Sequence, residues 1–227
     1  MAGLTDQAGG DHPFSAQIKD ARASWQESML RRLDELRQAV LAHDPIQLAA
    51  RCGASFNESQ LSFAYWGAHV HITWPALTAE SDQGHALSTF DHAMLLYYLS
   101  QADGTPQADR WIAFRELPDG AFYHQAFTGY SGNQLAAAFG SRPDDFTTAA
   151  QAMHGIRLTA FAEHAFAFQA LPRIRLAAAL YPGDEDFPAK AAVLFDAAAS
   201  HYMVTDGLAL LGAGLARRLQ KLDPQAR

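Results

Sequence analysis

Two stretches of alternating polarity constrain this chain more than any other feature. The first covers residues 61–74 with Gly67 near its centre, and the second covers residues 164–181 with Pro172 near its centre. Alternation with a period of two is typical of β-strands that bury one face. A glycine or a proline between two such runs marks a junction between strands, so each stretch predicts a β-hairpin.

Helical patterns surround the two hairpins. Apolar residues recur there at spacings of three and four, which is the period of an amphipathic helix. We expect helices at residues 23–42, 45–51, 87–98, 133–139, 144–153 and 208–222. The helix at 87–98 is apolar over a wide arc and should be central. Because the strands occur in hairpins without regular βαβ alternation, the sequence predicts a single α+β domain, in which both hairpins form one mostly antiparallel sheet covered by helices. This domain is expected to span residues 21–227, after a flexible tail at residues 1–20.

The charge balance makes nucleic acid a poor partner. The 227 residues include 24 acidic and 17 basic side chains, for a net charge of −7, and the basic residues are dispersed along the chain. Such a chain lacks the basic stripe that neutralises phosphates. No uninterrupted apolar run approaches the roughly 20 residues that span a bilayer, so we expect no membrane insertion.

The single cysteine, Cys52, excludes an intramolecular disulfide and any zinc or iron–sulfur site that needs several cysteines. The first residues are rich in glycine and include Asp6 and Asp11, unlike the start of a secretory signal peptide. These features favour a cytoplasmic protein.

Side chains that can bind a metal or transfer protons are most concentrated in residues 187–208. This stretch contains Asp196, Ser200, His201 and Tyr202, just ahead of the last helix. A histidine nitrogen is the commonest protein ligand of transition metals, including haem iron and the cobalt of corrinoids, and a nearby carboxylate fixes its tautomer. His201 is therefore a candidate axial ligand or general base. The alternative is a histidine that hydrogen-bonds structural backbone at the start of a helix.

Five collinear segments carry a resemblance to a known family. They are residues 102–107, 111–127, 170–173, 194–196 and 200–202. In these segments the chain resembles a prokaryotic domain-of-unknown-function family, the one numbered 3786, which has no assigned reaction. Some members look like fusions of this domain to an iron–sulfur module of the kind found in corrinoid proteins. The resemblance thus implies tetrapyrrole or corrinoid chemistry, although this chain lacks the cysteine-rich module.

A second candidate site is a pair of histidines. His69 and His71 are two residues apart on an expected strand, so both point to one face. His-x-His is a recurrent spacing of metal ligands, and His92, His124 or Glu163 can supply a third ligand. The competing interpretation, which we favour, is the solvent face of a hairpin.

Aromatic residues gather between residues 111 and 130. The six rings can line a flat apolar pocket together with His124, namely Trp111, Phe114, Phe122, Tyr123, Phe127 and Tyr130. Rings at this density belong more often to a core, but the polar tips of Tyr123 and His124 need partners, and a bound ligand can provide them.

These features favour a binding protein for a planar, largely apolar cofactor of the tetrapyrrole type, either a corrinoid such as cobalamin or haem. The expected cofactor-binding residues are His201, Tyr202, Ser200, Asp196, Tyr123, His124, Phe127 and Trp111, and the expected metal ligands are His201, His69 and His71. Two other classes stay open, namely a metal-dependent enzyme that uses the histidine pair and an interaction domain without a ligand.

Overall fold

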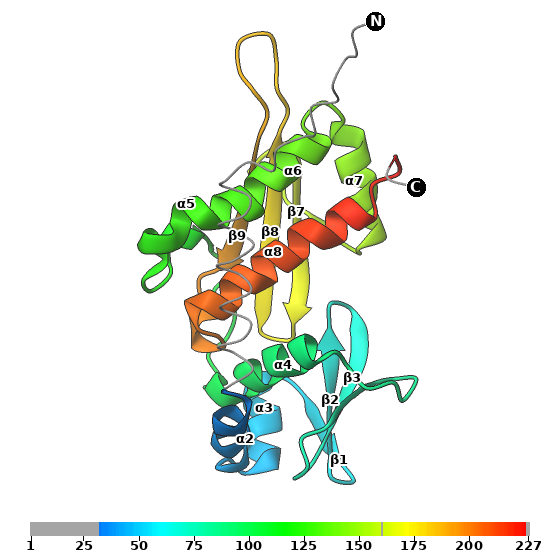
Figure 1. The fold of residues 1–227 in the computed structure, drawn as a ribbon, viewed down its shortest axis with the longest axis vertical. Helices are drawn as coiled ribbons and strands as arrows, with labels where there is room; N and C mark the ends of the chain where they lie inside the picture. The colour runs from blue at the N-terminus through cyan, green and yellow to red at the C-terminus, as the bar shows by residue number, and fades with distance from the viewer. Residues whose placement is uncertain (1–31, 160, 226–227) are drawn as a thin grey trace, which may run out of the picture.

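The computed structural model describes residues 32–159 and 161–225 (Figure 1). Its helices are α2 (Leu33–Leu41), α3 (Pro45–Cys52), α4 (Thr89–Gln101), α5 (Gly120–Tyr130), α6 (Gly132–Phe139), α7 (Pro143–Ala152) and α8 (Thr205–Lys221), with the short 3-10 turns η1 (Phe114–Glu116) and η2 (Ala199–His201). Its strands are β1 (Ser55–Asn57), β2 (Gln60–Tyr65), β3 (Ala68–Thr73), β4 (Ala79–Ser81), β5 (Trp111–Ala113), β6 (Ile156–Arg157), β7 (His164–Leu171), β8 (Ile174–Tyr181) and β9 (Lys190–Asp196). The expected tail at residues 1–20 and the first part of the helix expected at 23–42 lie outside the described residues.

The strands β1 to β4 form a small antiparallel sheet in chain order. The hairpin predicted at residues 61–74 is confirmed, because β2 pairs with β3 and places Phe63 opposite Val70. Trp66 and Gly67 make the two-residue turn, and their φ angles are both positive, 51° and 82°. Positive φ at both positions matches the twist of the flanking strands. Glycine adopts this conformation readily, whereas a tryptophan there is unusual.

The large sheet has the strand order β5-β9-β8-β7-β6, and every neighbouring pair is antiparallel. β7 and β8 form the second predicted hairpin, so both the α+β class and the antiparallel pairing are confirmed. The prediction that the two hairpins share one sheet is wrong, since they belong to separate sheets. A backbone hydrogen bond of 2.9 Å, from the Trp66 N–H to the Ala170 carbonyl, joins their edges.

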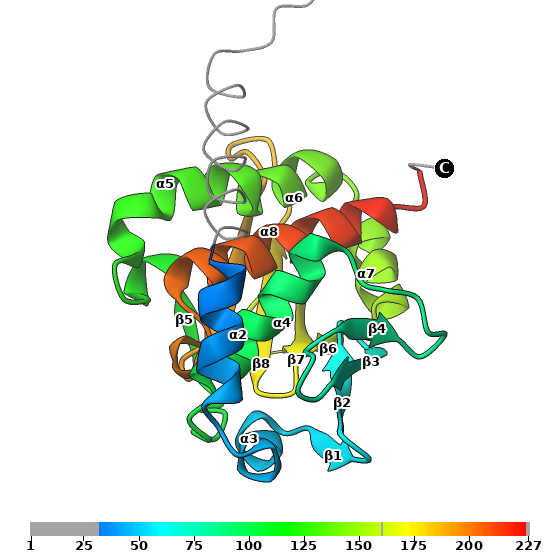
Figure 2. The same cartoon turned by 60° about the horizontal axis from the view of Figure 1, so that its bottom comes forward.

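The core lies between the large sheet and the helices that cover one of its faces. α6 and α8 lie across this sheet in both views (Figures 1 and 2). Phe166 and Phe195 are buried on the covered face, and Phe127 of α5 stacks on Phe114 with ring centroids 4.2 Å apart. A Cβ at Gly212 of α8 would lie 2.7 Å from the Phe127 ring, so glycine at this position allows α8 to approach α5.

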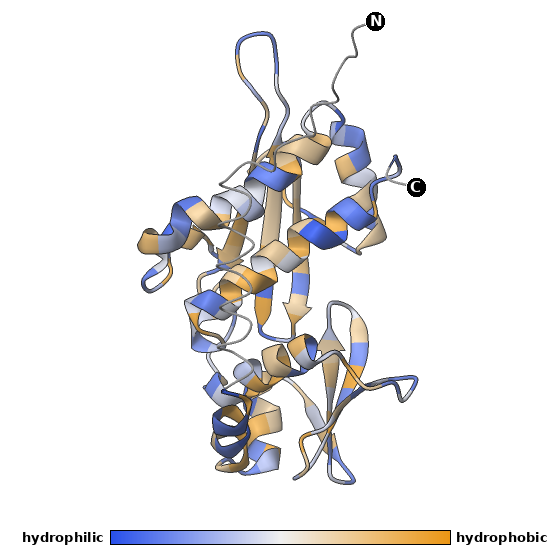
Figure 3. Ribbon diagram, in the orientation of Figure 1, coloured by the Kyte–Doolittle hydropathy of each residue, from blue (hydrophilic) through white to orange (hydrophobic). Residues whose placement is uncertain are grey.

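Helix α4 is buried around much of its circumference, as its wide apolar arc predicts. Its residues 93–99 are all buried, and it packs against α2 and α3. Figure 3 shows the contrast between α2, which is largely hydrophilic, and the more hydrophobic α4, β7 and β8. A helix without a polar face belongs inside a fold, and α4 therefore forms part of the core beside the small sheet.

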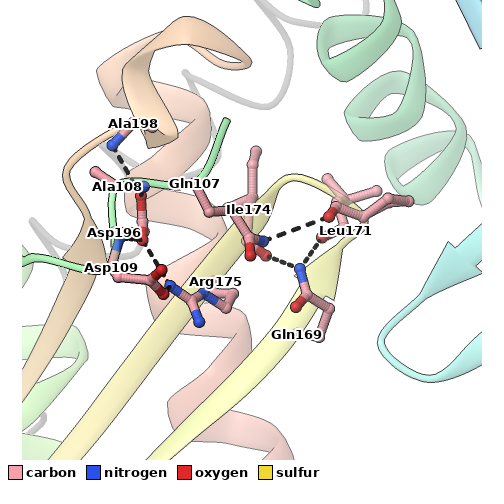
Figure 4. A network of polar contacts seen from close by, with 10 residues as sticks. Gln107, Ala108, Asp109, Gln169, Leu171, Ile174, Arg175, Asp196 and Ala198 are labelled. Carbon is pink, nitrogen blue, oxygen red and sulfur yellow. Dashed lines mark hydrogen bonds and ion pairs between the residues drawn. The ribbon is translucent and has the colours of Figure 1, made fainter. Parts of the chain in front are cut away.

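Asp196, the last residue of β9, is a buried carboxylate that links three parts of the chain (Figure 4). It accepts hydrogen bonds from the backbone N–H groups of Ala108, Asp109 and Ala198 at 2.9 to 3.0 Å. Arg175 also donates to it at 2.9 Å and pairs with Asp109. Burial would raise the pKa of Asp196, but the bonds from Ala108 and Ala198 and the charge of Arg175 outweigh it and hold this pKa below its usual range. The network fixes the segment that precedes β5 against the large sheet.

Replacing Asp196 with alanine tests this network. The change leaves three backbone donors without their acceptor and removes one carboxylate from Arg175. Breaking a buried ion pair costs about 3–5 kcal/mol, so the free energy of unfolding in urea should fall by about that amount. The control is Asp186→Ala in the exposed β8–β9 loop, where the carboxylate makes no hydrogen bond or ion pair within the described residues. Equal losses in the two variants would contradict the network's importance.

Two phenylalanines of α5 test the position of the core. Phe127 is 2% exposed and Phe122 is 84% exposed. Phe127→Ala opens a cavity and should lower the free energy of unfolding by about 3–5 kcal/mol. Phe122→Ala should change it by less than about 0.5 kcal/mol, as is usual for a surface residue. Similar urea midpoints for the two variants would show that Phe127 is not a core residue.

Candidate functional site

A half-open pocket of about 510 Å³ lies where the end of α4 meets the beginnings of α5 and α8. It is lined by Gln101, Pro118, Asp119, Phe122, Tyr123, Ser200, Met203, Val204, Thr205 and Asp206. Apolar side chains and a few polar groups thus share one concave surface. This mixture and this volume are typical of sites for small molecules.

Large apolar side chains are exposed at this pocket. Phe122 and Tyr123, from the first turn of α5, are 84% and 57% exposed, and Val204 is 39% exposed. Single exposed apolar residues are common on protein surfaces, but several at one concavity mark a place where a ligand or a partner binds.

His201 is not itself a lining residue, but it follows Ser200, which lines the pocket, and its imidazole ring is oriented. Its Nδ1 lies 2.7 Å from the Asp103 carboxylate and 3.2 Å from the Thr105 hydroxyl. Because a carboxylate only accepts, Nδ1 carries the proton and donates it to Asp103. The side chain is 47% exposed, and no described residue makes a hydrogen bond with Nε2. This nitrogen can therefore accept a proton or bind a metal.

Asp103 is held in place by its own loop. Its carboxylate accepts a hydrogen bond of 2.8 Å from the Thr105 N–H, and the Tyr202 hydroxyl donates to the Thr105 carbonyl. Slight burial would raise the pKa of Asp103, but the Thr105 N–H and His201 lower it below the usual range. The loop thus presents an ionised carboxylate to a histidine that is 98 residues away in the sequence.

Two residues predicted to bind a cofactor, Tyr202 and Asp196, make contacts within the protein. Tyr202 is fully buried, with its ring centroid 5.7 Å from that of Tyr98. The Asp196 carboxylate makes no hydrogen bond with His201, since its recorded donors are three backbone N–H groups and an arginine. The carboxylate that orients His201 is Asp103, which was not among the site residues predicted from the sequence. The one signal for it was its place in a segment of family resemblance.

The predicted aromatic cluster divides into three environments. Tyr123 lines the pocket, whereas Phe127 belongs to the core. The guanidinium carbon of Arg175 lies over the ring of Trp111 in β5, 5.5 Å from the centroid of that ring. The Nδ1 atom of His124 is buried and has no hydrogen-bond partner among the described residues. Of the six rings predicted to line a pocket, Phe122 and Tyr123 do so.

The histidine pair of β3 lies in the small sheet. His71 has both ring nitrogens engaged, since the Ser62 hydroxyl lies 2.9 Å from Nδ1 and Nε2 lies 2.7 Å from the Asp82 carboxylate. His92, a predicted third ligand, makes a 2.7 Å hydrogen bond with a backbone carbonyl. Among the residues that the structure describes, no three or more His, Cys, Asp or Glu side chains gather in a way that could hold a metal ion. No described residues therefore complete a three-ligand metal site with His69 and His71.

Comparison with known proteins identifies the family. Within residues 32–159 and 161–225, no helix combines the length and apolarity needed to cross a bilayer. No curated protein and no solved structure matches the chain. The profile of a family described as a domain of unknown function (DUF3786) matches residues 44–218, more than three quarters of the sequence. This range includes every residue of the pocket and the His201–Asp103 pair, and the chain belongs to the DUF3786 family.

Proposed function

We propose that the protein binds a planar tetrapyrrole, a corrinoid or haem, in the pocket beside His201, with Nε2 of His201 as the metal ligand. The observation that carries this proposal is the state of the imidazole ring. Nδ1 is committed to Asp103 at 2.7 Å, while Nε2 has no hydrogen bond from the described residues and the side chain is about half exposed.

A carboxylate behind a histidine suits the ring to bind a metal. Hydrogen bonding at Nδ1 sets the tautomer and the ring orientation, so that Nε2 presents its lone pair. A histidine prepared in this way is a common axial ligand of metallated tetrapyrroles. When bound, such a cofactor supplies redox or group-transfer chemistry at its metal, whereas the residues of this chain supply orientation and an apolar surround.

The walls of the pocket suit a flat ring system. Phe122, Tyr123 and Val204 provide exposed apolar surface that a planar ligand would cover. Ser200 and Gln101 add a hydroxyl and an amide, which can hydrogen-bond polar substituents of the ring. The pocket therefore fits the ligand class that the free imidazole nitrogen suggests.

The other two function classes have less support. A metal-dependent enzyme at His69 and His71 requires His71 to give up a hydrogen bond to Ser62 or Asp82. An interaction domain without a ligand would use the exposed rings of the pocket to bind another protein. The free Nε2 atom favours a small-molecule ligand over both.

We place this binding function in the cytoplasm. Burial raises the pKa of the Cys52 thiol to about 11, so this single cysteine stays protonated and poorly reactive. A chain with one free, buried thiol fits a reducing compartment. The net charge of −7 supports a small-molecule partner rather than nucleic acid.

Spectral titration with haemin, and separately with hydroxocobalamin, tests the proposal. The wild-type protein should show a saturable shift of the visible bands that survives desalting, because an imidazole replaces another axial ligand. His201→Ala should bind at least about tenfold more weakly and lose the shift, with little change in melting temperature. The control is His85→Ala, an exposed histidine ahead of α4, which should behave as the wild type.

Asp103→Asn separates ring orientation from ligation. It should weaken binding by roughly 10- to 100-fold while keeping the band positions at saturation, because His201 remains the ligand. The proposal is wrong if neither cofactor gives a saturable shift, or if His201→Ala and His85→Ala bind equally well. A lower melting temperature for His201→Ala, with an unaltered ligand spectrum, would assign His201 a structural role.

A further inference from the structure

Two partly buried arginines make no ion pair with any residue that the structure describes. Arg142 and Arg175 each pair with two aspartates. By contrast, neither Arg51 nor Arg173 makes an ion pair within the described residues, although both are partly buried. The Nε atom of Arg173 is also buried without a hydrogen-bond partner in this part of the chain. An unsatisfied donor on a charged group is costly, which calls for an acceptor.

Both arginines lie near the C-terminal end of α3, since Arg51 belongs to its last turn and Arg173 lies beside the residue that follows it. A Cβ at Gly53, two residues after Arg51, would lie 3.4 Å from the Nε atom of Arg173. A Cβ at Gly104 would lie 3.4 Å from the Cγ atom of Arg51. Both glycines are exposed and have positive φ, 70° and 93°. No side chain at residue 53 or 104 therefore covers the arginines.

The turn that carries Arg173 is held by three polar side chains. Gln169 donates at 2.5 Å to the carbonyl of Leu171, the last residue of β7 (Figure 4). Gln107 donates to the Pro172 carbonyl at 3.4 Å. The Tyr98 hydroxyl accepts a hydrogen bond of 3.1 Å from the Arg173 N–H and donates to the carbonyl of the last residue of α3. The backbone of Arg173 is thus fixed to the helix end that carries Arg51.

We propose that Arg51 and Arg173 form a binding site for an oxyanion, the phosphate or carboxylate group of a small molecule. A guanidinium presents several N–H donors in a planar fork that matches the oxygens of both groups. Such a group would accept hydrogen bonds from the two guanidinium groups and neutralise two charges that make no ion pair with the described residues. The fixed turn reduces the entropy lost when the anion binds.

Nearby acidic side chains do not fill this role. Asp103, next to Gly104, is engaged with His201 and with the Thr105 N–H. Neither arginine lines the pocket beside His201, so the oxyanion site stands on separate residues. Its test is independent of tetrapyrrole binding.

Titration of the full chain with inorganic phosphate, and separately with acetate, at constant ionic strength tests the site. At least one anion should raise the melting temperature saturably, and the stronger one identifies the group that the site prefers. Arg173→Gln should weaken that binding at least about tenfold. It should leave the melting temperature without anion unchanged or higher, because an unsatisfied buried donor is removed. The control is Arg115→Gln, an exposed arginine of η1, which should bind as the wild type.

Amide chemical shifts of the wild-type protein give a second measurement that needs no variant. Saturable shifts at Gly53, Gly104 and Arg173 during the same titration support the site. The proposal is overturned if neither anion gives saturable shifts at these amides. It is also overturned if Arg173→Gln and Arg115→Gln respond to the anion as the wild type does.

Discussion

The buried carboxylate of Asp196 is the interaction on which the functional region depends. A charge without solvent exposure costs several kcal/mol unless donors surround it, and here Arg175 and three backbone N–H groups do so. Two of those N–H groups, from Ala108 and Asp109, belong to the segment between α4 and β5. This otherwise irregular segment is therefore attached to the end of β9, next to η2.

The attached segment serves two neighbouring sites. Asp103 and Thr105 contact His201 on η2, while Gly104 lies against Arg51 and Gln107 supports the turn that carries Arg173. A loop of this kind would be mobile without fixed ends, and a carboxylate on a mobile loop orients a histidine poorly. The order of the binding region thus follows from a charge that the protein buries at some distance from the ligand.

Local patterns predicted the hairpins and the buried helix α4, because alternation and a wide apolar arc report directly on burial. They did not predict β9, whose central residues Ala191-Ala-Val-Leu-Phe195 are apolar at every position and so show no period of two. They also could not separate the two sheets, since alternation specifies a buried face and not a pairing partner. Strand pairing is decided by contacts that are distant in sequence.

Contacts between residues distant in sequence also explain why the candidate site was predicted only in part. His201 could be chosen by residue type, whereas its partner Asp103 is 98 residues away and carries no local sign of the contact. The carboxylate nearer in sequence, Asp196, accepts hydrogen bonds from backbone N–H groups and Arg175 and makes none with His201. Phe122 and Phe127 are the same residue type on one helix, yet only tertiary packing makes one a pocket residue and the other a core residue.

The most direct test of this account is the tautomer of His201 in wild-type protein and in Asp196→Asn. Asparagine keeps the shape of the side chain but removes its charge and replaces one acceptor with a donor, which should release the segment that carries Asp103. Imidazole nitrogen chemical shifts, recorded where the ring is neutral, report which nitrogen is protonated. The account predicts a proton on Nδ1 in the wild type and a shift of population toward Nε2 in the folded variant. An unchanged Nδ1-protonated ring in folded Asp196→Asn would contradict it.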